Sequence, residues 1–208
     1  MIRDYQSEQD LVILFDSLGV FGRNGHYKYT SGFHGPDYFK KEYLISNLTV
    51  VSDLARLIAE NLYENLPKNK IVVAGPVFGG ALLANKVAEE LNKLGSSIEY
   101  SIPLGKSDKE LIIKPPYNKL LKGAEVLFVD DVINRGRSLF QSIELIYHSG
   151  GKVTQVASIF SHGFIDSQKL GLPVKALLTR KSIAYHPDEC PMCRAGIPLN
   201  KEFGHGDE

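Results

Sequence analysis

Two adjacent aspartates, Asp130 and Asp131, stand between an apolar run and a turn at residues 134–138 that reads Asn-Arg-Gly-Arg-Ser. The apolar run predicts a buried strand, and the periodic segment after the turn predicts a helix. We expect Ser138 to cap that helix, with Gln141 completing a capping box. Such a turn presents backbone N–H groups and the positive end of a helix dipole, which together bind phosphate. Carboxylates beside a phosphate site suit ribose hydroxyls or a magnesium ion. Two other roles remain open for the aspartate pair, a plain helix cap and the magnesium pocket of a signalling domain.

A second glycine-rich turn, residues 75–80, has the same setting. It follows the apolar run 71–74 and precedes a helical segment at 81–94, which Gly95 is expected to end. A strand followed by a glycine turn and a helix is again a candidate anion site. A tight connection that binds no ligand is the alternative.

The elements that must position these turns alternate along the chain. We expect a first helix at 8–19, short strands or an extended loop within 25–48, and a helix at 52–66 capped by Ser52. The later elements are strands at 71–74 and about 98–103, a polar segment at 105–122, a strand at 126–130, a helix at 139–148, and strands at 153–160 and 174–178. Alternating strands and helices predict an α/β fold with a mostly parallel sheet and right-handed crossovers. Ligands of such sheets bind beyond the carboxyl ends of the strands, where both turns lie.

Composition narrows the class of protein further. The chain has 208 residues and 43% hydrophobic residues, which suit a single sizeable domain. Its 24 basic and 24 acidic residues balance, so we expect no nucleic-acid partner and no attraction to anionic membranes. No apolar window approaches the roughly 18 residues of a membrane span, and we expect a cytoplasmic protein.

Four segments together resemble a known family. The phosphoribosyl-diphosphate (PRPP) motif of type I phosphoribosyltransferases resembles VLFVDDVINRGRSL, and their pyrophosphate loop with its helix resembles VVAGPVFGGALLANKVAEEL. The N-terminal segment of the orotate phosphoribosyltransferases resembles GHYKYTSGFHGPDYF. The cysteine-bearing C-terminal tail of one bacterial and archaeal branch resembles YHPDECPMCRAGIPLNK. The resemblance runs from about residue 10 to residue 203.

The resemblance implies an activity, a fold and a set of site residues. Such enzymes bind PRPP with Mg²⁺ and transfer its ribose 5-phosphate to a base, here a pyrimidine and most closely orotate, with release of pyrophosphate. The fold is a Rossmann-like core at about 50–180, with a hood from 1–49 and 181–208 in one domain, and the assembly is a homodimer. Catalytic roles fall on Lys106, Lys109 and Asp131. PRPP binding falls on Gly75, Gly79, Gly80, Asp130, Asp131, Asn134, Arg135, Gly136, Arg137 and Ser138, of which Asp130 and Asp131 also hold magnesium through water. Base binding falls on Ser31, Phe33, Tyr38, Phe39 and His162.

The chain departs from the family pattern in the parts that act on the substrate. Its phosphate turn carries Arg135 and Arg137 where the family has small residues. Its mobile loop has Gly105 and Leu111 where the family has an arginine and a histidine. These departures keep two alternatives open, a PRPP-binding regulatory module with little or no catalysis and a phosphoribosyltransferase for another base.

Two further departures concern the base. The pair Ser161-His162 stands where the family has Asp-Arg, and Phe33 stands where a polar residue usually follows Ser-Gly. A neutral imidazole is a poor substitute for the arginine that reads the orotate carboxylate. Since protonated His162 would recover part of that contact, we expect weak orotate turnover that improves toward pH about 6.5. Arg135 or Arg137 could replace the missing arginine instead.

Cys190 and Cys193 form a Cys-x-x-Cys pair, which is half of a tetrahedral zinc site. We considered His186 or His205 as further zinc ligands. Because the chain has no second Cys-x-x-Cys, the sequence favours a paired tail or free thiols. We expect His26 and His34 to be surface residues.

Overall fold

The computed structural model describes residues 7–29, 31–67, 70–107 and 110–203 of the chain. These residues divide into two compact units, which we describe separately. Of the described residues, those within 45–180 form the sheet unit, and those within 7–44 and 181–203 form the terminal unit. Among the described residues, no helix has both the length and the apolar character needed to cross a membrane.

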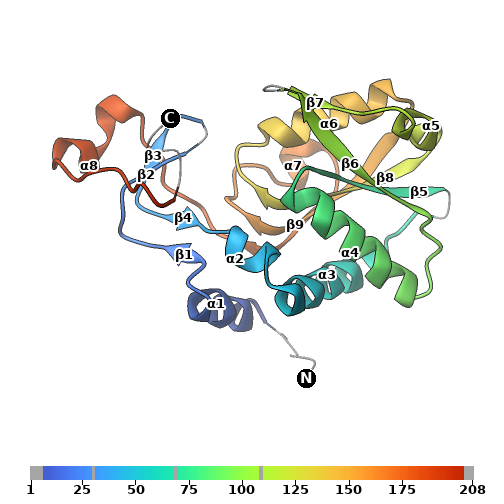
Figure 1. Cartoon of the computed structure of the whole chain (residues 1–208), viewed down its shortest axis with the longest axis horizontal. Coiled ribbons are helices and arrows are strands. Elements are labelled where there is room, and N and C mark those ends of the chain that lie inside the picture. Colours follow the sequence, from blue (N-terminus) through green and yellow to red (C-terminus); the bar gives the residue numbers. More distant parts are fainter. Residues whose placement is uncertain (1–6, 30, 68–69, 108–109, 204–208) are drawn as a thin grey trace. The chain divides into compact units, whose positions relative to one another are not determined.

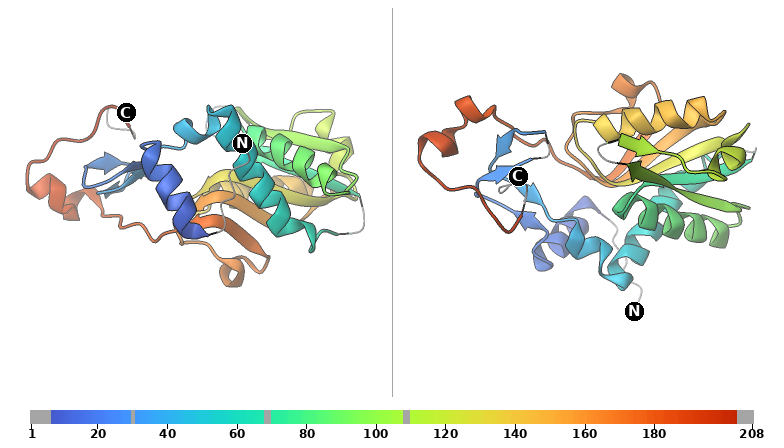
Figure 2. Two further views of the ribbon diagram at one scale, coloured as in Figure 1. Left: turned by 90° about the horizontal axis from the view of Figure 1, so that it is seen from below. Right: turned by 45° about the horizontal axis from the view of Figure 1, so that its top comes forward.

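The sheet unit is built on a six-stranded sheet with the order β10-β9-β8-β5-β6-β7 (Figures 1 and 2). Its strands are β5 Ile71–Pro76, β6 Tyr100–Ser107, β7 Glu110–Ile112, β8 Glu125–Ile133, β9 Lys152–Ser161 and β10 Val174–Thr179. All neighbours run parallel except β7, which is antiparallel to β6. This arrangement confirms the predicted α/β fold with a mostly parallel sheet.

Helices cover both faces of this sheet (Figure 1). Helix α4 Gly79–Lys93 contacts β5, β6 and β8, while α3 Leu48–Tyr63 packs on α4 and reaches β9 and β10. Helices α5 Tyr117–Leu121 and α6 Arg137–His148 bury Leu121, Leu139 and Ile146 in a cluster with alternate residues of the central strands, including Val72, Val126 and Phe128. Alternate strand residues point to opposite faces, so each central strand is buried on both sides. A short helix, α7 Ser167–Leu170, precedes β10.

The predicted start of α3 was wrong. The helix begins at Leu48, because the Asn47 side chain accepts a hydrogen bond from the Val50 N–H at 3.2 Å. Ser52 lies inside the helix and does not cap it.

The predicted capping box of α6 was also wrong. Gly136, with φ of +84°, takes the N-cap position, and no side chain of the described residues caps this helix. Ser138 lies in the first turn instead, where its carbonyl accepts a hydrogen bond from the Ser142 hydroxyl at 2.7 Å.

The polar segment 105–122 contains more regular structure than the sequence indicated. Strand β7 folds back on β6, with Gly105 opposite Ile112 and Lys106 opposite Leu111, and α5 follows. Strand β8 likewise continues past the aspartate pair to Ile133. The extra length arises because Val132 and Ile133 still pair with Phe160 and Ser161 of β9.

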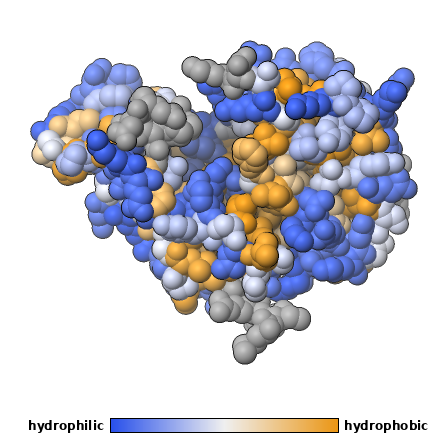
Figure 3. All heavy atoms as spheres, viewed as in Figure 1, coloured by the Kyte–Doolittle hydropathy of each residue, from blue (hydrophilic) through white to orange (hydrophobic). Residues whose placement is uncertain are grey.

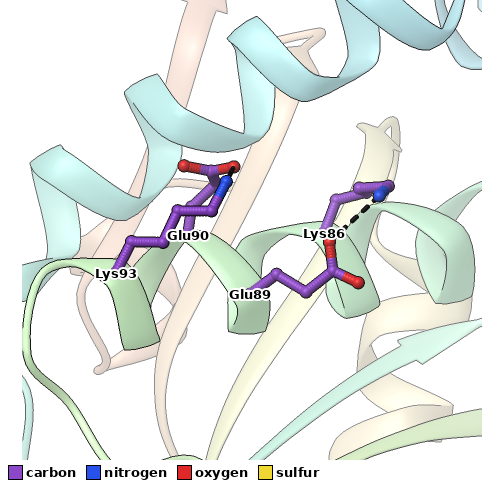
Figure 4. A network of polar contacts seen from close by, with 4 residues as sticks. All are labelled: Lys86, Glu89, Glu90 and Lys93. Atoms are coloured by element: carbon purple, nitrogen blue, oxygen red, sulfur yellow. Dashed lines mark hydrogen bonds and ion pairs between the residues drawn. The ribbon is translucent and has the colours of Figure 1, made fainter.

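The exposed side of α4 is charged, while its N-terminal end is apolar. Lys86 bonds Glu89 at 3.0 Å and Lys93 bonds Glu90 at 2.6 Å (Figure 4). Such solvent-exposed pairs add little stability. Figure 3 shows apolar side chains gathered over the start of α4, where Phe78 is 85% exposed and Leu82 is 56% exposed.

The terminal unit consists of short elements. They are α1 Glu8–Ser17, β1 Phe21–Gly22, β2 Tyr27–Lys28, β3 His34–Gly35, β4 Tyr38–Phe39, α2 Glu42–Ile45 (which leads into the sheet unit), η1 Pro187–Glu189 and α8 Pro191–Arg194. A Ser7–Asp10 capping box starts α1. Strand β1 pairs with β4, and β2 pairs with β3. The rings of Phe15, Phe21 and Phe39 pack edge to face at centroid distances of 5.6 to 5.9 Å and form the centre of this unit.

Candidate active site at the carboxyl ends of the central strands

The two glycine turns leave neighbouring strands at the point where the sheet reverses direction. Taken in chain order, the parallel strands lie side by side as second, first, third, fourth and fifth, so the reversal falls between β5 and β8. The last pair between the two strands is Ala74 of β5 with Phe128 of β8, directly before the β5–α4 turn and two residues before Asp130. In open parallel sheets, ligands bind in the crevice at this switch point. The fold therefore brings both candidate anion sites to the position where a ligand is expected.

Asp130 and Asp131 lie at the end of β8 in a fixed orientation. They are only 8% and 2% exposed. One oxygen of Asp130 accepts the Asp131 N–H at 2.8 Å, and one oxygen of Asp131 accepts the Val132 N–H at 2.7 Å. Charge-assisted hydrogen bonds of this kind hold a carboxylate more firmly than neutral ones. The pair thus forms a rigid acidic wall of the site.

The β5–α4 turn closes directly on this wall because three of its residues are glycines. A Cβ on Gly79 would overlap the Asp131 carboxylate, and a Cβ on Gly80 would lie 2.8 Å from Asp130 Oδ1. A Cβ on Gly75 would overlap backbone atoms of Val129 and Gly80. The structure therefore brings Gly75, Gly79 and Gly80 together with the aspartates, as expected for one site. The Val77–Phe78 peptide in this turn is cis.

The β8–α6 turn, residues 134–138, presents the start of a 12-residue helix. Gly136 supplies the left-handed conformation of the turn, and a Cβ there would also approach Ile165 and Phe140 to about 3 Å. Since no described side chain caps α6, its first-turn N–H groups face no competing capping oxygen. An anion is favoured at such a helix start.

Arg135 and Arg137 of this turn stand where the family pattern has small residues. Both side chains are exposed. The Arg135 guanidinium lies over the Phe164 ring, 5.0 Å from its centroid. Phe164 belongs to the loop after β9, which also carries His162. Arg135 therefore places a permanent positive charge at that loop.

His162 is a buried, neutral imidazole. The backbone N–H of His162 donates to the Ile133 carbonyl at 2.9 Å, and the imidazole ring packs edge-on against the Phe160 ring at a centroid distance of 5.0 Å. Burial lowers the pKa of His162 to about 4. The ring therefore stays neutral from pH 6 to 8.5, and the expected protonation near pH 6.5 was wrong.

The lysines expected to act from the mobile loop are only partly described. Lys106 is an exposed residue of β6 next to the β6–β7 connection. Lys109 lies outside the described residues.

The other expected base-binding residues belong to the terminal unit. Ser31 is exposed, and Phe33 contacts the His186 ring edge-on at 5.9 Å. Tyr38 stacks on Tyr27 at 5.5 Å. Phe39 is buried with Phe15 and Phe21, which is the position of a core residue.

The sequence reasoning missed a second polar cluster, in the terminal unit. His26 and His34 were expected at the surface, yet both are buried beside Cys190 and Cys193. Burial, followed by the nearby His26 ring, lowers the pKa of His34. Of the two histidines considered as zinc ligands beside the cysteines, His186 has its Nδ1 3.2 Å from Asp188 Oδ2, and His205 is outside the described residues. The sequence feature that could have indicated this cluster is the pair of histidines, eight residues apart, on either side of a turn.

Comparison with known proteins agrees with this geometry. The sequence model of the protein family described as the phosphoribosyl transferase domain matches residues 45–169 of this chain. An orotate phosphoribosyltransferase of Pelotomaculum thermopropionicum is 30% identical over 198 residues, covering 94% of this chain and 96% of that protein. One of Caldicellulosiruptor bescii is 33% identical over 180 residues, covering 85% and 87%.

A solved structure supports the fold. The orotate phosphoribosyltransferase of Mycobacterium tuberculosis superposes with a TM-score of 0.62 at 19% identity, covering 83% of this chain and 95% of that one. With the switch-point aspartates, both glycine turns and these matches taken together, the chain belongs to the type I phosphoribosyltransferase family.

Proposed function

We propose that this protein is an orotate phosphoribosyltransferase, which converts orotate and PRPP into orotidine 5′-phosphate and pyrophosphate. The observation that carries the proposal is the close contact between the β5–α4 glycine turn and the Asp130–Asp131 pair. Relatives named for this reaction match nearly the whole chain, which supports the choice of orotate.

In this proposal, three parts of the site each bind a different group of PRPP. The N–H groups of the turn 134–138 hold the 5′-phosphate at the start of α6. The glycines at 75, 79 and 80 leave room for the pyrophosphate beside the start of α4. Asp130 and Asp131 face the ribose hydroxyls, where a carboxylate is the natural acceptor.

The same carboxylates fit the Mg²⁺ that the family uses. Two rigid, buried carboxylates beside an anion site are hard oxygen ligands of the kind Mg²⁺ prefers, directly or through water. When bound, the ion neutralises charge on the departing pyrophosphate. The residues of the chain do the remaining work, since the fixed carboxylates stabilise positive charge that develops on the ribose. By the family resemblance, we assign to Lys106 and Lys109 the role of adding positive charge beside the pyrophosphate.

We assign recognition of the orotate carboxylate to Arg135. Neutral His162 cannot supply the positive charge that an orotate carboxylate needs. The Arg135 guanidinium can, because it lies over the ring of Phe164, which belongs to the same loop as His162. Ser31, Phe33 and Tyr38 remain proposed base contacts, and the buried position of Phe39 gives it a structural role instead. The neutral His162 also favours a second candidate, a phosphoribosyltransferase for an uncharged base such as uracil.

We further propose that the protein works as a homodimer in the cytoplasm. The family's mobile loop serves the neighbouring subunit, and the exposed apolar side chains Phe78 and Leu82 at the start of α4 suit a protein contact.

The test is an assay of pyrophosphate release with PRPP, Mg²⁺ and a panel of bases. We expect orotate to be the preferred base, with a higher kcat/KM than uracil, adenine or guanine. Turnover of uracil alone would support the second candidate. Tight PRPP binding with no turnover of any base would favour a regulatory module.

A further inference from the structure

The buried cluster in the terminal unit joins residues far apart in sequence. His26 directly precedes β2, and His34 begins β3 of the same hairpin. Cys190 and Cys193 stand before and within the short helix α8 of the C-terminal tail. His26, His34 and Cys190 are 3%, 7% and 0% exposed, so three of the four polar side chains are removed from water.

Backbone hydrogen bonds hold the tail beside the hairpin on two sides of the cluster. His34 and Tyr185 exchange N–H to carbonyl bonds of 2.9 and 2.8 Å. Farther along, the Asn200 N–H donates to the His26 carbonyl at 2.7 Å. The tail between these two points carries both cysteines, so their position follows from the fold of the whole unit.

The distances within the cluster match the edges of a metal-centred tetrahedron. His26 Nε2 lies 3.0 Å from His34 Nδ1, 3.5 Å from Cys190 Sγ and 3.6 Å from Cys193 Sγ, and His34 Nδ1 lies 3.3 Å from Cys193 Sγ. Zinc bonds of ordinary length at tetrahedral angles would separate two nitrogens by about 3.3 Å and a nitrogen from a sulfur by about 3.6 Å. All four ligand atoms lie within 4.8 Å of one another.

Hydrogen bonding alone does not explain this arrangement. His26 Nδ1 lies 2.6 Å from the Ile197 carbonyl, which can only accept, so this nitrogen carries the proton. His26 Nε2 therefore has one lone pair, directed along one line, yet three polar atoms surround it at 3.0 to 3.6 Å. A single ion at their centre satisfies all of them. A carbonyl partner on the far nitrogen is also the usual support of a metal-bound histidine.

We propose that His26, His34, Cys190 and Cys193 bind one zinc ion, which fastens the C-terminal tail to the N-terminal hairpin. Two thiolates and two imidazoles in a tetrahedron are a ligand set typical of structural zinc, and Cys-x-x-Cys is its usual spacing. Four protein ligands leave no position for a substrate, so the role is structural. The unit needs such a fastening because its strands are only two residues long. This inference is independent of the proposed function.

The first test measures metal in the full-length protein, purified without metal-affinity steps and kept reduced. We expect elemental mass spectrometry to find about one zinc ion per chain. Cys190→Ser and Cys193→Ser should lose most of it, whereas the matched control His186→Ala, on the same tail, should keep it. Iron in place of zinc would overturn the assignment of the metal, and zinc retained by both cysteine variants would overturn the ligands.

A second test does not depend on variants that fold. Metal-free, reduced wild-type protein is titrated with Co²⁺, and we expect intense visible bands together with a sulfur-to-cobalt charge-transfer band, both removed by added Zn²⁺. Blocking the two thiols with a mercurial reagent should release the zinc in step with thiol loss. Weak octahedral cobalt bands, or no binding of Co²⁺ and Zn²⁺ by the reduced protein, would overturn the proposal.

Discussion

Replacing Gly79 with alanine tests how closely the β5–α4 turn must approach the aspartates. Gly79 starts α4, and an added Cβ would overlap the Asp131 carboxylate. The overlap is with Oδ2, so the carboxylate must turn, and we expect this to weaken the 2.7 Å hydrogen bond that its Oδ1 accepts from the Val132 N–H. A hydrogen bond to a charged group contributes about 1.5–3 kcal/mol, and the better helix propensity of alanine recovers at most about 1 kcal/mol.

We therefore expect Gly79→Ala to lower the free energy of unfolding by about 1–2 kcal/mol in urea denaturation. Because a displacement of about 1 Å in a catalytic group can cost roughly 100-fold, kcat/KM should fall by about that factor. Asn85→Ala, at an exposed position of the same helix, is the matched control and should change neither quantity appreciably.

A double-variant cycle shows whether the carboxylate is the cause. In an Asp131→Ala background the same methyl group meets no carboxylate, so Gly79→Ala should no longer destabilise the protein. Equal destabilisation in both backgrounds would refute the reasoning, because the methyl group would then clash with something else.

Three further predictions concern other parts of the molecule. Since burial lowers the pKa of His162 to about 4 while the unfolded value is about 6.5, His162 should make the folded state lose up to about 3 kcal/mol as pH falls from 6.5 to 4, and His162→Gln should flatten that slope in urea melts. An unchanged slope would place the ring in a more polar environment. Arg135→Ala should raise KM for orotate by roughly 10-fold or more while KM for PRPP changes less, since one charge-assisted contact is lost; equal effects on both substrates would assign Arg135 to the phosphate. Light scattering at micromolar concentration should give the mass of a dimer, and Phe78→Asp should shift it toward the monomer; a monomeric wild type would contradict the proposed assembly.

The sequence was sufficient to predict the fold class and the place of the aspartate pair. Both depend on strong local patterns, namely apolar strands followed at once by glycine turns. Helix starts were less well predicted, because Asn47 and Ser52 are both acceptable caps and packing decides between them. The length of β8 was likewise set by its pairing with β9, which no local pattern records.

The ionisation of His162 and the cluster around Cys190 could not be predicted. The first depends on burial by residues from other elements, which lowers the pKa of the ring. The second depends on the bridge between His34 and Tyr185, which joins segments about 150 residues apart in sequence. Periodicity and spacing describe neighbours along the chain, so contacts of this range stay hidden from them.

The most direct test of the central claim is calorimetric titration of PRPP with Mg²⁺ into wild type and into Asp130→Asn with Asp131→Asn. Asparagine keeps an oxygen that can accept the Asp131 and Val132 N–H groups, so the double variant should stay folded. We predict that it binds magnesium–PRPP at least about 2 kcal/mol more weakly, roughly 30-fold in Kd, because charge-assisted contacts are lost. Unchanged affinity in a folded double variant would contradict the assignment of this site.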